Sequence, residues 1–240
     1  MTALSLRPWT VTALNLPEHC RNPIHTDEGA RAAGFPAALV AGVSTYAYLT
    51  HPPAVGWGLD WIESGGAEVR FRSPVFHEDR LTCRPVEEGD GLYVDAVVGD
   101  KIRARAQVWL DPSEPPGHRD GEELTPHEIE LGPAWSQYAA RLGDDLDLYE
   151  ERSIVHPAAW PALANDVFHT QLVRGAWIHT RSIIRHHGVA AVGSVALVEA
   201  TVVDRFDSRV GERAVADITI SVDGRPVATL EHEAIIEVHD

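Results

Sequence analysis

An internal duplication in the order of the predicted elements constrains this chain more than any other feature. Each half of the 240 residues presents a loop with an Arg-x-x-x-His pattern, then a helix, then antiparallel strands. Arg21–His25 aligns with Arg152–His156, and Val40–Gly42 aligns with Val173–Gly175 after a two-residue insertion. A repeat of this kind decides the architecture. The order predicts an α+β fold of two copies, each with one helix wrapped by a curved antiparallel sheet, paired through their edge strands.

The helix of the first half is predicted from an apolar, uncharged run at 36–49, PAALVAGVSTYAYL. Its length and its alanine and leucine content favour a helix that is buried on nearly every side. Apolar and polar residues then alternate at 67–72 and at 102–110, which is typical of half-buried strands. Gly99-Asp100 supplies the turn before the second of these strands.

The helix of the second half is predicted from apolar residues at helical spacing with arginines outside the stripe. The stripe is Leu172, Val173, Ala176, Ile183 and Ile184, and the arginines are Arg174, Arg181 and Arg185. Strands are predicted near 194–206, 213–222 and 226–238, with Asp223-Gly224 as the tight turn between the last two.

A segment rich in proline and acidic residues separates the two halves. Residues 111–128 have the sequence DPSEPPGHRDGEELTPHE, with no apolar periodicity of either kind. We therefore predict an N-terminal repeat at 1–112, a linker at 113–128 and a C-terminal repeat at 129–240.

The composition excludes several classes of protein. A hydrophobic content of 44% is too high for a disordered chain. No apolar run approaches the roughly 20 residues of a membrane helix and the N-terminus lacks a signal-peptide pattern, so we expect a cytoplasmic protein. The formal charge of −16 would repel nucleic acids and anionic membranes. Cys20 and Cys83 are expected to be free thiols, and an enzyme is the leading class.

A set of motifs in the first half resembles a known family. Asn22–Asp27, followed by Ala30, Ala33–Phe35 and Leu39–Gly42, is similar to the MaoC-like family that includes (R)-specific enoyl-CoA hydratases, and Val69–Phe76 resembles its strand after the central helix. The second half matches only in element order. The resemblance implies a double hot-dog fold, a coenzyme A or carrier-protein thioester as substrate, and reversible addition of water to a 2-enoyl group. It implies no cofactor apart from that carrier portion of the substrate.

In that family a histidine and an aspartate five residues before it jointly hold the water. The histidine corresponds to His25 here, while the aspartate position is Cys20. A thiol with a reference pKa of about 8.5 is mostly neutral at pH 7, so it cannot orient an imidazole and a water as a carboxylate does. This departure bears on the hydratase reaction and leaves the fold prediction unchanged.

Several residues near His25 have both a functional and a structural interpretation. His25 is a candidate general base, or a loop histidine that satisfies backbone groups. Asn22 would hold the loop or the water, although asparagine before proline is also ordinary turn chemistry. Gly42 and Val43 would offer helix-start amides to the thioester oxygen, or Gly42 would allow close packing of helix on sheet. Asp27 is an alternative carboxylate, or the N-cap of a short helical turn at 28–33.

Further candidates lie outside this motif. Asp166 and His169, with Asn165, are expected on a loop or turn before Gly175. There they would approach the seam between the halves and complete a site with His25, or they would be surface residues. Arginines on polar strand faces could contact the phosphates of coenzyme A, or could be solvated; they are Arg70, Arg72, Arg103 and Arg105. We expect no metal, because the histidine and acidic clusters lack an i, i+4 pair of ligands.

We therefore predict an acyl-thioester hydratase or dehydratase in which His25 acts as general acid and base. A hot-dog thioesterase or an atypical lyase is the first alternative. A non-catalytic acyl-CoA-binding protein or partner subunit is the second. The expected partner is the acyl-thioester substrate, and a homodimer remains open.

Overall fold

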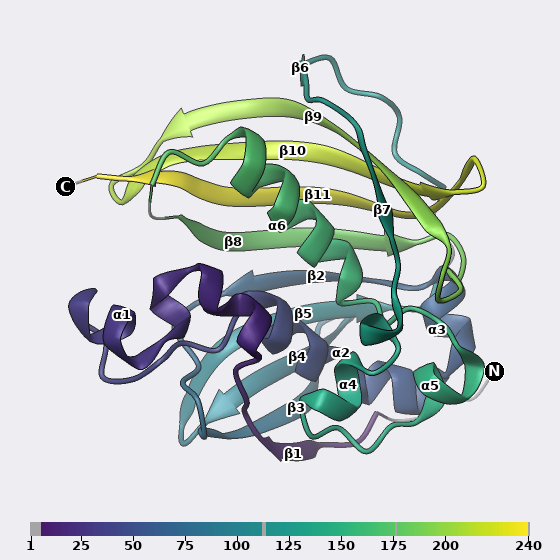
Figure 1. Cartoon of the computed structure of the whole chain (residues 1–240). Coiled ribbons are helices and arrows are strands. Elements are labelled where there is room, and N and C mark those ends of the chain that lie inside the picture. Colours follow the sequence, from purple (N-terminus) through teal and green to yellow (C-terminus); the bar gives the residue numbers. More distant parts are fainter. Residues whose placement is uncertain (1–5, 112–113, 176, 240) are drawn as a thin grey trace.

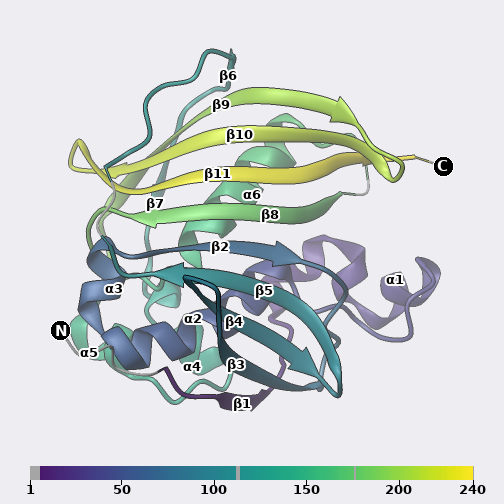
Figure 2. The same cartoon turned by 180° about the vertical axis from the view of Figure 1, so that it is seen from behind.

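The protein is described by a computed structural model that places residues 6–111, 114–175 and 177–239. Within these residues, eleven antiparallel strands form one sheet in the order β1-β3-β4-β5-β2-β8-β11-β10-β9-β6, and β7 also pairs with β9. The two long helices, α2 and α6, lie on the same side of the curved sheet (Figure 1; Figure 2). The predicted α+β double hot-dog fold is confirmed.

The first repeat contains a long helix, two short ones and five strands. They are β1 (Trp9–Thr12), α1 (Asp27–Ala32), α2 (Gly42–Trp57), α3 (Leu59–Ser64), β2 (Gly66–Phe71), β3 (Arg80–Glu88), β4 (Gly91–Val98) and β5 (Lys101–Trp109), with 3-10 turns η1 (Pro17–Arg21) and η2 (Pro23–His25). The strands predicted at 67–72 and 102–110 and the turn at Gly99-Asp100 are confirmed.

The long helix α2 differs from its prediction at both ends. Residues before Gly42 are extended, because Leu39 forms an isolated bridge to Phe76 and the Val40 N–H donates to the Val75 carbonyl. The helix then continues through Pro52 and Pro53 to Trp57.

A thiol compensates for part of the hydrogen bonding that these prolines remove. Pro52 has no N–H to offer the carbonyl of Tyr48, four residues earlier. The buried Cys83 Sγ instead donates to that carbonyl at 3.1 Å. The prolines are thus tolerated inside a buried helix.

The second repeat has one long helix against four long strands. Its elements are β6 (Glu122–Glu123), β7 (His127–Glu130), η3 (Pro133–Trp135), α4 (Tyr138–Arg141), α5 (Leu148–Arg152), α6 (Ala159–Gln171), β8 (Ile178–His186), β9 (Val195–Asp207), β10 (Gly211–Val222) and β11 (Arg225–Val238). The three predicted strands are confirmed, as is the turn at Asp223-Gly224, where φ is +51° and +71°.

The helix predicted over Leu172–Ile184 is wrong. Leu172 follows the end of α6, and Ile183 and Ile184 belong to strand β8. The strand pattern was hidden because its inward positions include buried polar residues, namely His179, Ser182 and His186. Ala176, part of the predicted stripe, lies outside the described residues.

The structure also corrects the internal alignment. Ile154 bridges Ala191 and the Val155 N–H donates to the Ala190 carbonyl, as Leu39 and Val40 do in the first repeat. His156 therefore corresponds to Ala41 and not to His25. The pairing of Val40–Gly42 with Val173–Gly175 is wrong, since 173–175 follow α6 instead of starting it.

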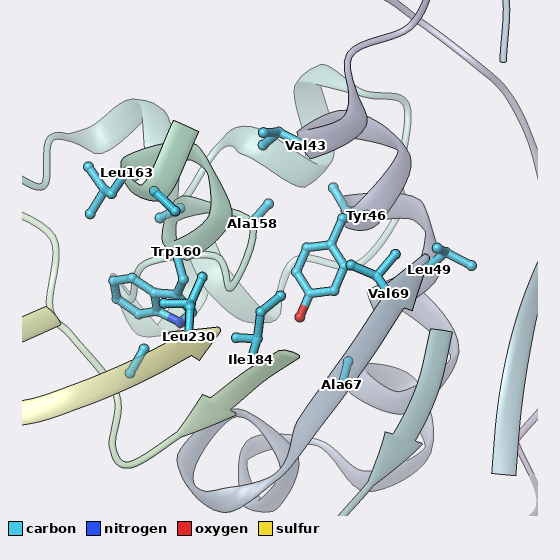
Figure 3. Close-up of a cluster of buried hydrophobic side chains, with 14 of the residues drawn as sticks. Val43, Tyr46, Leu49, Ala67, Val69, Ala158, Trp160, Leu163, Ile184 and Leu230 are labelled. Carbon is cyan, nitrogen blue, oxygen red and sulfur yellow. The ribbon is translucent and has the colours of Figure 1, made fainter. Parts of the chain in front are cut away.

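Strands β2 and β8 join the two repeats, with Ala67 opposite Ile184 and Val69 opposite Ser182. Gly66 is required at this seam, because a Cβ there would lie 2.5 Å from the Ile184 carbonyl oxygen. Figure 3 shows apolar side chains from both repeats meeting beneath it, with the ring of Tyr46 between Val69 and Ile184.

The predicted division into two repeats and a linker remains a prediction. The boundary at 112/113 lies outside the described residues. Within the proposed linker, Glu122 and Glu123 pair with β9, as does His127 at its end. No helix among the described residues is long and apolar enough to cross a membrane.

Candidate functional site

His25 is held beside the segment that leads into α2. Its Nδ1 donates to the Leu39 carbonyl oxygen at 2.8 Å, and a carbonyl can only accept. In the neutral ring Nε2 is therefore the unprotonated nitrogen, and it makes no hydrogen bond within the described residues. Burial lowers the pKa of His25, while the Leu39 carbonyl opposes this shift. The imidazole is thus a neutral base at pH 7.

Local contacts fix the loop that carries His25. Asn22 caps η2, with its Oδ1 accepting the Ile24 N–H at 3.4 Å. Thr26 caps α1 by accepting the Gly29 N–H at 3.1 Å, so the predicted capping role of Asp27 is wrong. A Cβ on Gly29 would lie 2.1 Å from the Pro23 carbonyl oxygen, so only glycine lets α1 pack this closely on the loop.

The other two candidates on this loop contact main chain or neighbouring charges. Cys20 is exposed, and its Sγ lies 3.9 Å from the His25 carbonyl oxygen. Asp27 accepts the Ala38 N–H at 3.0 Å and pairs with Arg31 at 3.1 Å. The Ala38 amide and the Arg31 charge lower the pKa of the Asp27 carboxyl. Asp27 thus ties α1 to the approach to α2.

A polar cluster that sequence reasoning missed lies beside His25. His19 Nε2 lies 2.9 Å from the Tyr138 hydroxyl and 3.3 Å from Ser44 Oγ, which is itself 2.9 Å from Tyr138. The His19 and His25 rings meet edge to face at 6.2 Å. Burial, with a smaller contribution from the His25 charge, lowers the pKa of His19 to about 4, so it is neutral at pH 7.

The start of α2 completes this region. Gly42 and Val43 occupy the first turn, where amide N–H groups lack intrahelical acceptors, and Ala41 has no side chain to cap them. A Cβ on Gly42 would lie 3.5 Å from both His179 Nδ1 and the Phe71 ring. Gly42 therefore faces residues from β2 and β8, while the Val43 side chain is buried.

The remaining candidates lie apart from this cluster. Asp166 and His169 belong to α6 and not to a loop, which corrects the prediction. Asp166 lies 4.0 Å from His127 Nε2, and the His169 ring lies near Trp177. They contact the second repeat and not the His25 loop.

The arginines differ in how they are engaged. Arg105 is paired with Asp95 and Glu88, which leaves it no free face for a phosphate. Arg70 pairs with Glu68 at 2.6 Å on the surface, and Arg72 is exposed. Of these three arginines, Arg72 is the one that forms no ion pair within the described residues.

One group of potential metal ligands occurs in the described residues: His51, Asp144 and Asp145. His51 Nδ1 already bonds Asp144 Oδ1 at 2.8 Å, and that oxygen also accepts the Leu146 N–H. The His51 ring stacks on Trp9 at 3.9 Å. These contacts account for the buried pair as a link between β1, α2 and the second repeat.

Comparison with known proteins shows that the region around this site is similar to a known family. The model of the MaoC-like domain matches residues 18–101, a range that contains His19, His25 and all of α2. No curated protein matches the chain by sequence.

Solved structures resemble the whole chain in fold. A MaoC domain dehydratase of Chloroflexus aurantiacus, described as putative, has a TM-score of 0.63 at 13% identity and covers 95% of each chain. A hypothetical protein of Mycobacterium tuberculosis with a double hotdog fold has 0.62 at 11%, covering 95% of this chain and 96% of that one. An oleoyl thioesterase of Lactobacillus plantarum, also described as putative, has 0.57 at 9%, covering 98% of each chain. At these identities the likeness concerns the fold of the chain alone.

Proposed function

We propose that the protein processes acyl thioesters, and that it hydrates 2-enoyl thioesters or dehydrates 3-hydroxyacyl thioesters. The match of residues 18–101 to the model of the MaoC-like domain supports the substrate class. One observation carries the reaction. The carbonyl of Leu39, which lies three residues before the uncapped start of α2, fixes His25 with Nε2 free of a proton.

In the proposed reaction, the thioester oxygen lies at the amides of Gly42 and Val43. His25 Nε2 takes a proton from water as the water oxygen bonds to C3, and the electron pair moves to the thioester oxygen. The resulting enolate is stabilised by the helix-start amides. The protonated His25 then delivers its proton to C2, which restores the neutral imidazole and gives the 3-hydroxyacyl product.

The polar cluster of His19, Ser44 and Tyr138 takes over the role of the missing carboxylate in this proposal. All three groups are neutral at pH 7, because burial lowers the pKa of His19 and raises that of Tyr138. Each of the three side chains can hydrogen-bond to the other two, and together they can orient a water beside His25. Cys20, which is exposed, has no part in the proton transfer.

The test is His25→Asn. The asparagine Nδ2 can occupy the position of Nδ1 and keep the bond to Leu39, while the base at Nε2 is lost. We expect the rate of loss of enoyl absorbance with a 2-enoyl-CoA panel to fall at least about 10²-fold. His169→Asn, on the exposed end of α6, is the matched control and should retain full activity.

Two results would contradict the proposal. Unchanged turnover in His25→Asn would remove His25 from the reaction. Release of free thiol from saturated and unsaturated acyl-CoA alike, with no hydration, would make the protein a thioesterase instead.

A further inference from the structure

A second histidine cluster lies in the C-terminal repeat, where the His25 mechanism does not use it. Ser182 Oγ lies 2.8 Å from His179 Nε2 and 2.8 Å from His232 Nδ1. His179 and Ser182 are on β8 and His232 is on β11. Their exposed fractions are 8%, 0% and 0%. The three side chains form one buried hydrogen-bonded chain.

Both ends of this chain are unsatisfied. His179 Nδ1 and His232 Nε2 are buried and have no hydrogen-bond partner in the described residues. The Arg181 main chain lies near enough to affect the pKa of His179, yet does not meet hydrogen-bond geometry at Nδ1. Buried polar atoms without partners are rare in native proteins. Two such atoms at the two ends of one hydrogen-bonded series of side chains therefore require an explanation.

One end is aimed at the start of α2. His179 Nδ1 would lie 3.5 Å from a Cβ on Gly42, and the Phe71 ring packs against the His179 ring at 4.7 Å. Gly42 follows Leu39 by three residues, and Leu39 holds His25. Imidazoles from the two repeats thus approach the same short segment from different elements.

The hydrogen-bonding roles in the chain are coupled. Ser182 has one hydroxyl proton, so it donates to one imidazole and accepts from the other. In one arrangement His179 carries a proton on Nδ1, and in the other it presents a lone pair there. Interconversion removes a proton from His232 Nε2 and adds one to His179 Nδ1, with water as acceptor and donor. Burial keeps both rings neutral at pH 7, since it lowers the pKa of His179 to about 3 and that of His232 well below its usual value.

We propose that His179 is a further catalytic residue of the acyl-thioester site, whose Nδ1–H donates a hydrogen bond to the acyl oxygen at the first turn of α2. This inference rests on the proposed function. Ser182 and His232 are positioning residues that fix the tautomer of His179. A neutral imidazole is suited to this task, because it can stabilise a developing enolate without carrying a charge into a buried site.

A matched pair of substitutions tests the donor. In His179→Asn, the amide Nδ2 replaces Nδ1 toward Gly42, while the contact to Ser182 is lost. In His179→Gln, the amide replaces Nε2 toward Ser182, while the donor facing Gly42 is lost. We expect His179→Gln to weaken the binding of octanoyl-CoA, a saturated thioester that cannot be hydrated, by tenfold or more in calorimetry. His179→Asn should bind more tightly than His179→Gln. A purely structural histidine would give the reverse order, which would overturn the proposal.

A spectroscopic measurement tests the tautomer separately. Nitrogen-15 spectra of the histidine rings should show His179 protonated at Nδ1 when octanoyl-CoA is bound. In Ser182→Ala the signals of His179 should indicate a mixture of tautomers. A His179 ring whose signals do not change on binding would overturn the inference.

The failure of this inference can be told apart from that of the proposed function. If octanoyl-CoA binding responds to the His179 pair but no enoyl-CoA is hydrated, the donor role is supported and the hydratase reaction is not. If hydration depends on His25 but neither binding nor turnover responds to the His179 pair, only the donor role is refuted.

Discussion

Acidification from pH 7 to pH 5 should destabilise this protein strongly, because several histidines are buried as neutral rings, three of which are His156, His179 and His186. His156 and His186 are 1% exposed and His179 is 8% exposed. Burial, as the largest cause, lowers their pKa values from 6.5 to about 3 for His156 and His179 and to about 4 for His186.

The sign of the effect follows from proton binding. Below pH 6.5 the unfolded chain takes up protons on these rings and the folded chain does not, so unfolding becomes more favourable as the pH falls. Each pH unit in this window contributes about 1.4 kcal/mol per histidine. Between pH 7 and pH 5 each ring therefore costs about 2 kcal/mol, and the three together about 5 to 6 kcal/mol. That loss is comparable to the roughly 5 to 15 kcal/mol of total stability of a typical domain.

The assay is urea unfolding at pH 7, 6 and 5, followed by tryptophan fluorescence. His186→Asn is the informative variant, since the asparagine amide can keep the bond that His186 Nδ1 donates to the Trp61 carbonyl at 2.9 Å. Between pH 7 and pH 5 its free energy of unfolding should fall about 2 kcal/mol less than that of the wild type. The exposed control His169→Asn should keep the wild-type slope. A free energy of unfolding that is flat between pH 7 and 5 would refute the reasoning.

Two further predictions concern the thiol under α2 and the acid limb of activity. Cys83→Ala should lower the free energy of unfolding by about 1 to 3 kcal/mol, because the Tyr48 carbonyl loses its donor, whereas Cys83→Ser should be milder; equal losses in chemical denaturation would contradict this role. Since burial lowers the pKa of His25 and the neutral ring is the base, the acid limb of kcat/KM for a 2-enoyl-CoA should have its midpoint below pH 6.5. A midpoint at or above 6.5 would argue against His25 as that base.

Much of the fold could be predicted because apolar periodicity reports burial. The strands β9 to β11 and the turn at Asp223-Gly224 follow from alternation and from turn chemistry, which are local properties. The prediction was wrong at strand β8, because its inward face carries His179, Ser182 and His186 and apolar residues therefore do not mark the buried side. Two of these buried polar residues, His179 and Ser182, belong to the cluster for which a role in substrate binding is proposed.

The candidate site was predictable only where a linear motif carries it. The Asn22–Asp27 motif pointed to His25, whose place beside Leu39 depends on local chain geometry. Tyr138 lies 119 residues from His19, and no sequence pattern announces their contact. Ser44 lies two residues after Gly42, close to the motif, but its proposed role depends on its contacts with His19 and Tyr138.

The duplication leads to a final prediction. Although the protein has a similar long helix in each repeat, α2 and α6, we expect it to bind one acyl thioester. At α6 the entry is closed by its own residues: His156 Nδ1 accepts the Ala158 N–H at 3.0 Å, and Pro157, which corresponds to Gly42, has no N–H. At α2 the corresponding positions are Ala41 and Gly42, which leave the first-turn amides uncapped by any side chain. Only α2 therefore keeps the donors that a thioester oxygen needs. Calorimetry with octanoyl-CoA should give one site per chain, abolished or weakened by bulk at Gly42, as in Gly42→Val. Two equivalent sites would mean that the amides at the start of α2 are not what binds the substrate.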